Sequence, residues 1–243
     1  SATDSQLWLS VDHNTLQTVW QGGDGLWSTG DWKSKQYTRP YGTDIYDENF
    51  FDGDLAYFTD TSTGDYTVTV DRDVLVSGVD VTTAGNVTLD GDNGIEAVAT
   101  DPDHILGDYA NVIPGQNNLG FRTTGMLVKK GAGILTLATK TANVWTNGTI
   151  INGGTIKLSG QDVLGIYDSA SATDNGKATF TASGTNVVST RKQTLQNQFT
   201  VASGITNARI GTEDASGKNA SHTTVKAGAG ATAALVNPNA GLV

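Results

Sequence analysis

Alternation of apolar and polar residues with period two, interrupted at short intervals by Gly, Asn and Asp, constrains this chain most. Residues 66–91 read YTVTVDRDVLVSGVDVTTAGNVTLDG. Because successive side chains of a β-strand point to opposite faces, this pattern predicts strands of about four to six residues with one buried face. The predicted buried positions are aliphatic: Val68, Val70, Val74, Val76, Val79, Val81, Val87 and Leu89.

The same pattern returns along the rest of the chain, in the segments 127–137, 149–159, 177–189, 197–211 and 222–236. Strands separated this regularly by turn residues predict either a stacked solenoid or a sandwich. The short spacing and the small aliphatic side chains favour an all-β, right-handed parallel β-helix, whose coils stack at about 4.8 Å. A β-sandwich or jelly roll is the alternative fold.

The aromatic residues are distributed unevenly, which predicts two regions. Four of the five tryptophans, Trp8, Trp20, Trp27 and Trp32, lie in the first 32 residues. The end of a stack exposes unpaired backbone groups that must be covered, and bulky rings suit that purpose. We therefore expect residues 1–60 to form an aromatic-rich N-terminal cap and residues 61–243 to form the repeat region. The alternation fades at about 92–125, which predicts an inserted loop.

Composition excludes several classes of function. The formal charge is −10, from 25 acidic and 15 basic residues, so nucleic acid is a poor default partner. The short basic runs Lys129–Lys130 and Arg191–Lys192 are interpreted as solvated turn charges. Cysteine is absent, which excludes disulfides, thiolate zinc sites and cysteine nucleophiles.

Membrane and export signals are also missing from the sequence. No stretch reaches the roughly 18 apolar residues of a transmembrane segment. The start, SATDSQ, has no basic or apolar signal region, so any signal peptide is expected to have been removed.

Residues 129–165, KKGAGILTLATKTANVWTNGTIINGGTIKLSGQDVLG, resemble the autotransporter-associated β-strand repeat of bacterial surface proteins. The opening WQGGDGLWSTGDWKSK at 20–35 resembles the tryptophan-rich lead-in of such repeats. The resemblance implies a passenger-type β-helix that is secreted or displayed on the outer surface of a bacterium. It carries no catalytic residues, because the repeat is a scaffold beneath many activities. The expected function is a structural or interaction module for adhesion or for binding extracellular glycans and glycoproteins of the mucin type, with the oligomeric state left open.

An enzymatic alternative depends on the tripeptide Asp60-Thr61-Ser62. Acid proteases place an Asp-Thr-Gly or Asp-Thr-Ser turn after an apolar strand, and two such carboxylates share one proton. Asp60 would then serve an aspartate-dependent hydrolase that acts on extracellular glycoprotein. A second copy of the motif is absent, so a polar turn between strands is favoured over this interpretation.

Two further groups of residues suggest ligand binding. Asp90 and Asp92, with Glu96 beyond them, cluster oxygen ligands suited to calcium, the one cofactor considered, although the EF-hand spacing fails and a turn is favoured. Aromatic residues of the cap could form a platform for stacking sugars, although packing in the core is favoured. They are Trp20, Trp27, Trp32, Tyr37 and Tyr41.

Overall fold

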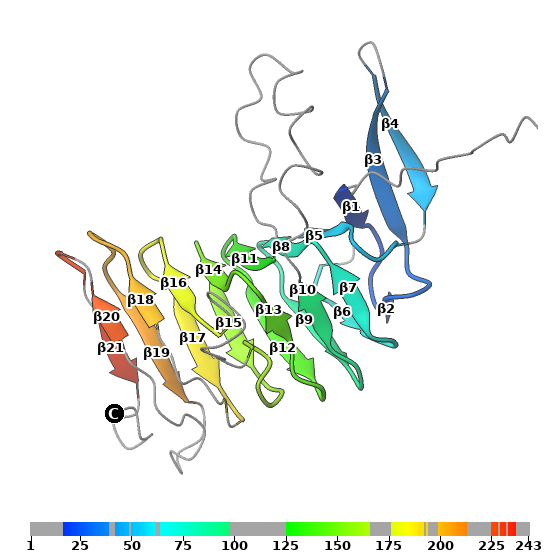
Figure 1. Cartoon of the computed structure of the whole chain (residues 1–243). Coiled ribbons are helices and arrows are strands. Elements are labelled where there is room, and N and C mark those ends of the chain that lie inside the picture. Colours follow the sequence, from blue (N-terminus) through cyan, green and yellow to red (C-terminus); the bar gives the residue numbers. More distant parts are fainter. Residues whose placement is uncertain are drawn as a thin grey trace, which may run out of the picture.

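The structure is a computed structural model that describes most of the chain between residues 17 and 236. The described residues are 17–38, 42–48, 50–61, 64–97, 125–165, 176–191, 193, 199–212, 225–227, 229–231 and 233–236. Every regular element within them is a β-strand, so the predicted all-β class is confirmed (Figure 1). These residues include no helix with the length and hydropathy needed to cross a membrane.

The strands form three sheets. The ten-stranded sheet contains, in spatial order, β20 (Val225–Ala227), β18 (Phe199–Val201), β16 (Ala178–Phe180), β14 (Thr149–Ile151), β11 (Met126–Lys130), β8 (Gly78–Thr82), β5 (Leu55–Thr59), β1 (Gln17–Trp20), β3 (Trp32–Thr38) and β4 (Gly42–Glu48). The eight-stranded sheet contains β2 (Gly25–Leu26), β6 (Tyr66–Thr69), β9 (Val87–Gly91), β12 (Ile134–Thr139), β15 (Thr155–Leu158), β17 (Asn186–Ser189), β19 (Ala208–Thr212) and β21 (Ala233–Val236). The three-stranded sheet contains β13 (Val144–Trp145), β10 (Ile95–Ala97) and β7 (Val74–Val76).

The chain visits these sheets in a repeating order. From β5 onward, one strand in the ten-stranded sheet is followed by one in the eight-stranded sheet, and β7, β10 and β13 add a third strand to three of these repeats. Each predicted strand segment from 127–137 onward holds two strands, one for each large sheet; 149–159, for example, holds β14 and β15. All strand pairs among the described residues are parallel except β1–β3 and β3–β4. The predominantly parallel pairing differs from the antiparallel layers of a sandwich.

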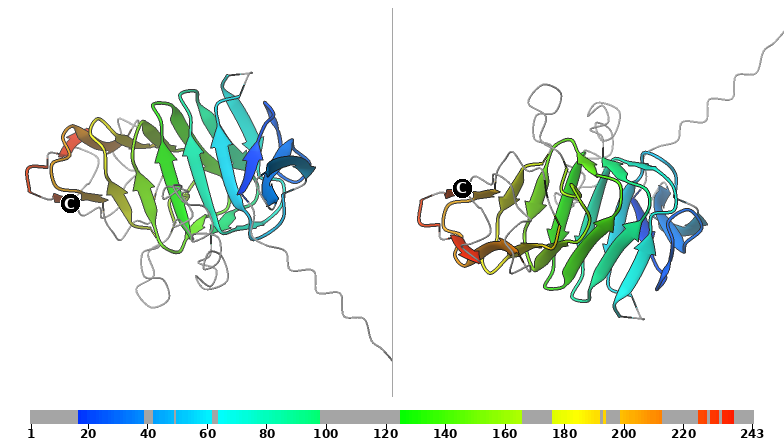
Figure 2. Two further views of the ribbon diagram at one scale, coloured as in Figure 1. Left: turned by 90° about the horizontal axis from the view of Figure 1, so that it is seen from above. Right: turned by 90° about the horizontal axis from the view of Figure 1, so that it is seen from below.

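We call the parallel strands from β5 onward the stack, and Figure 2 shows them side by side along the long axis of the molecule. All eight aliphatic positions predicted to be buried in 66–91 are at most 2% exposed, which confirms that prediction. A single hydrophobic cluster contains side chains from all three sheets, among them Val81, Leu89 and Ile95. The sheets therefore share one core.

An aromatic cluster, which together with the β3–β4 hairpin we call the cap, closes the N-terminal end of this core. It consists of Trp20, Trp27, Trp32, Phe50 and Phe58, none more than 5% exposed. The ring centroid of Trp32 lies 5.0 Å from those of Trp20 and Phe50 and 5.1 Å from that of Trp27. Edge-to-face and tilted contacts of this kind add stability beyond the burial of apolar area.

The predicted boundaries of the two regions differ in detail from the observed pairing. Strands β1 and β2 lie within the predicted cap, yet they pair in parallel with β5 and β6 and so extend both large sheets. Strand β10 lies within the predicted insertion and pairs with β7 and β13. The rest of that insertion, 98–124, lies outside the described residues.

Candidate functional site

Asp60, the candidate catalytic aspartate, lies in an exposed turn directly after β5. Its Oδ1 atom accepts hydrogen bonds from the backbone amides of Ala84, at 2.8 Å, and Gly85, at 2.9 Å. These amides belong to the turn between β8 and β9, one repeat further along the chain. Asp60 therefore links two successive turns of the stack. Ser62 of the acid-protease-like tripeptide lies outside the described residues.

A second carboxylate reaches the same turn. Asp65 accepts hydrogen bonds from the backbone and the side-chain amide of Asn86, each at 2.8 Å. These two bonds hold the pKa of Asp65 below its ordinary value of 3.8. The Oδ1 atoms of Asp60 and Asp65 lie 3.6 Å and 3.3 Å from the position that a Cβ on Gly85 would occupy. The two carboxylates thus approach the same turn, and each binds its own backbone amides, as expected of the polar turn that the sequence favours.

Lys129 was predicted as a solvated turn charge, and that prediction is wrong, because its side chain is fully buried. It occupies an inward position of β11, in register with Val81 of β8 and Ile151 of β14. The same column continues through buried apolar residues on both sides: Trp20, Phe58, Val81, Ile151, Phe180 and Val201. Lys129 thus places an amine in an otherwise apolar column.

The amine of Lys129 makes its hydrogen bonds with backbone carbonyl groups at the end of β11. Its Nζ donates to the backbone carbonyls of Lys130 and Gly131, the latter at 3.1 Å. Burial lowers the pKa of Lys129 to about 8, and the negative charge of Asp60 opposes that change. The alternation of residues along β11 does indicate that Lys129 is buried. Leu127 and Lys129 are two positions apart and therefore share a face of the strand, and Leu127 is buried.

Tyr66 completes a polar corner with Asp60 and Lys129. Its hydroxyl donates to the carbonyl of Thr59 at 3.0 Å. Burial raises the pKa of Tyr66, and the charge of Asp60 raises it further. The charge of Asp60 thus acts on both the phenol of Tyr66 and the amine of Lys129. Each of the three groups makes hydrogen bonds to the backbone of a turn or strand end.

Asp90, Asp92 and Glu96, the three candidate calcium ligands, each have a different environment. Asp90 Oδ1 accepts a hydrogen bond from Thr69 Oγ1 at 2.8 Å, and Asp92 forms an exposed ion pair with Lys140. Glu96 is exposed on β10. In the part of the chain that the structure describes, no three carboxylate or imidazole groups gather as metal ligands.

The aromatic candidates are mainly buried. Trp20, Trp27 and Trp32 are at most 1% exposed, so their faces contact other rings rather than solvent. Stacking on a sugar needs an exposed ring face, and these three residues offer none. Tyr37 lies on β3, opposite Thr43 of β4, and Tyr41 lies outside the described residues.

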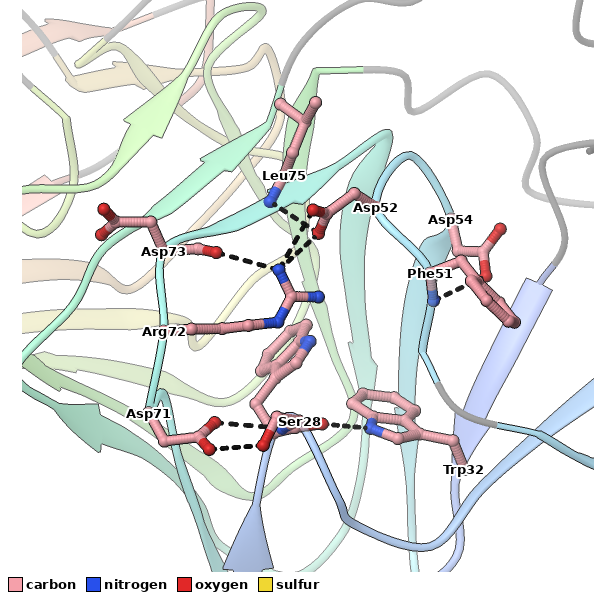
Figure 3. A network of polar contacts seen from close by, with 10 residues as sticks. Ser28, Trp32, Phe51, Asp52, Asp54, Asp71, Arg72, Asp73 and Leu75 are labelled. Carbon is pink, nitrogen blue, oxygen red and sulfur yellow. Dashed lines mark hydrogen bonds and ion pairs between the residues drawn. The ribbon is translucent and has the colours of Figure 1, made fainter.

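A polar network joins the segments after β2 and before β5 to the turn between β6 and β7 (Figure 3). Asp52 accepts hydrogen bonds from Arg72 Nη1 at 2.9 Å and from the amide of Leu75 at 3.3 Å. Asp71 binds both the amide and the hydroxyl of Ser28. The loop before β5 also covers the free edge of β7, since the amide of Gly53 donates to the carbonyl of Leu75 at 2.9 Å. This network serves the packing of the N-terminal end.

Comparison with known proteins adds no relative: no family model, no curated protein and no solved structure matches this chain.

Proposed function

We propose that the three sheets wrap into a right-handed parallel β-solenoid, and that this solenoid is a rigid structural and interaction module on the exterior of a bacterium. The observation that carries the proposal is the constant parallel register of successive repeats. Val79, Leu127 and Thr149, for example, stand in one column of the ten-stranded sheet. Between two strands of that sheet the chain always passes through the eight-stranded sheet, from β5 to β21. Connections between parallel strands of one sheet are right-handed in about 98% of cases, which supports the proposed hand.

The turns support the resemblance to the autotransporter-associated repeat. Gly133 and Gly154 lie in the turns that carry this resemblance, after β11 and after β14. A Cβ added to Gly133 would lie 1.9 Å from the carbonyl oxygen of Gly85, and one added to Gly154 would lie 2.4 Å from that of Gly133. Successive turns therefore touch through their backbones, and a side chain at either position would separate them. This geometry gives Gly133 and Gly154 a role in stacking, and it supports the repeat-like scaffold from which the proposal starts.

The exterior of the eight-stranded sheet is the surface that we propose for binding. Thr67, Thr88 and Thr136 stand in register on β6, β9 and β12, each half-buried between inward-facing residues. Parallel strands lie about 4.8 Å apart, so these threonines form a regular row. Lys157 of β15 continues it. A row of hydroxyl groups suits hydrogen bonding to an extended glycan, and the proposed partner is an extracellular glycan or glycoprotein of the mucin type.

Retention of the folded protein on immobilised mucin-type glycans tests this proposal. We expect Thr88→Glu and Thr136→Glu to weaken retention by about tenfold or more, equivalent to at least about 1.4 kcal/mol. Thr179→Glu, on the outward side of β16 in the other large sheet, is the matched control and should bind as the wild type does. A folded wild type that is not retained, or a loss of the same size in all three variants, would contradict the proposed binding surface.

A further inference from the structure

The ten-stranded sheet ends at β4, which pairs with β3 over seven residue pairs. Within the described residues, no strand pairs with the other side of β4. Such an edge presents backbone N–H and C=O groups that can pair with a further strand. The edge of β7 at the same end of the molecule differs, because the loop before β5 already binds it.

The β3–β4 hairpin is also placed so that its edge can be reached. Strand β1 pairs with β3 only as far as Lys35, so the ends of β3 and β4 distant from the core extend past it. Figure 1 shows the hairpin projecting away from the row of parallel strands. Both strands contain seven residues, more than any strand of the stack. A partner strand could thus align with β4 without contacting the stack.

The charge of β4 indicates which partner fits. Its sequence, GTDIYDE, contains Asp44, Asp47 and Glu48 and no basic residue. Asp47 stands opposite Lys33 of β3, whereas Asp44 and Glu48 stand opposite the uncharged Gln36 and Trp32. Pairing with β4 of a second copy would bring like charges together, which destabilises cross-strand pairs. A strand rich in Lys or Arg would instead gain opposite-charge pairs.

We propose that β4 is a strand-addition site for an extended, Lys- or Arg-containing segment of a partner protein. Backbone hydrogen bonds along the edge would supply affinity, and the acidic sequence of β4 would favour a basic segment. This inference goes beyond the proposed glycan binding and does not depend on it, because it concerns a different sheet edge and a different class of partner.

Binding of a fluorescent eight-residue peptide with alternating Lys and Val, measured by anisotropy with the full chain, tests the proposal. A second peptide of the same sequence carries N-methyl groups on alternate amides, which removes strand pairing and keeps the charge. We expect the first peptide to bind and the methylated one to bind at least about tenfold more weakly. Hydrogen exchange should slow in residues 42–48 when the first peptide is added.

Two variants separate the edge from general electrostatic attraction. Asp44→Lys should weaken binding by about tenfold, because it replaces attraction with repulsion at the edge. Asp73→Lys makes the same charge change in the exposed turn between β6 and β7, and binding should stay within about twofold of wild type. Equal binding of both peptides, or equal losses in both variants, would overturn the proposal in favour of nonspecific attraction. No binding of the first peptide would also overturn it, and the acids of β4 would then only guard the edge.

Discussion

The cap and the stack solve the same problem, burial of apolar surface, in different ways. In the cap, one ring touches several others: the centroid of Trp27 lies 5.1 Å from those of Trp32 and Phe50 and 5.7 Å from that of Phe58. In the stack, many inward positions are aliphatic residues that repeat in register, such as Leu89, Leu137 and Leu158. A non-repeating end needs large, irregular contacts, whereas a repeat is served by one side chain of moderate size in each strand. Because the cap and the stack are packed differently, each region must be tested by its own substitutions.

The largest effect is expected in the cap. Trp27→Ala should lower the free energy of unfolding by about 3–5 kcal/mol, because it removes a fully buried ring and leaves a cavity among three others. Val68→Ala, at a fully buried position of β6, should cost about 2 kcal/mol. Urea unfolding monitored by circular dichroism measures both values. Equal losses would show that stability is not concentrated in the cap.

The next test concerns how closely the turns of the stack approach one another. Gly131 and Gly184 share a φ of +73°, but a Cβ on Gly131 would lie 2.2 Å from the carbonyl oxygen of Thr83, while nothing lies within 4 Å of one on Gly184. Gly184→Ala should therefore cost only the left-handed backbone conformation, about 1–2 kcal/mol. Gly131→Ala should cost about 1–3 kcal/mol more, because the turns must separate. Thermal unfolding of the two variants measures the contribution of the contact between successive turns. Equal losses of stability in both variants would show that the turns do not touch.

The sequence predicts the buried face of the stack better than it predicts the polar corner around Asp60, Tyr66 and Lys129 or the pairing of β10. Period-two alternation identified Val68, Val81 and Leu89 as buried, because side-chain direction in a strand follows position alone. The same rule places Lys129 on the buried face of β11, but a charged residue in a Lys-Lys pair predicts exposure to solvent. The contacts of Asp60 with residues 84 and 85 could not be predicted, because they depend on which turns stack. The pairing of β10 was missed because a strand of three residues gives almost no periodic signal.

A moderate effect is expected from the buried amine of the stack. In the folded protein Lys129 has a pKa of about 8, against an ordinary value of 10.5, so between these pH values the unfolded chain binds more protons. Stability should therefore rise as the pH increases from about 8 to 10.5. Lys129→Met should flatten this rise, whereas Lys157→Met, on the outward face of β15, should retain it. Unfolding midpoints in urea between pH 7 and 10.5 measure the difference, and an unchanged slope in Lys129→Met would contradict the account of this residue.

The smallest effect is expected at the surface of the polar corner. The pKa of Asp65 is lowered by its hydrogen bonds with Asn86, so its contribution to stability is present above pH 3.8 and disappears as the pH falls through the lowered pKa. Asp65→Ala should be slightly less stable than wild type at pH 7 and equally stable at strongly acidic pH. Asp73→Ala, in a turn without this contact to Asn86, is the control at both pH values. Thermal unfolding at pH 7 and pH 2 checks the prediction, and a loss that persists at low pH would disprove the electrostatic cause.

Disulfide trapping between β12 and β15 tests the parallel register of the stack most directly, because the chain has no cysteine of its own. The structure pairs Ile134 with Thr155 and Thr136 with Lys157. Cysteines at either pair should form a disulfide on mild oxidation, since a bridge needs Cα atoms within about 7 Å. The crossed pairs, Ile134 with Lys157 and Thr136 with Thr155, should remain reduced. Bridging of the crossed pairs in place of the direct pairs would show antiparallel strands and contradict the account.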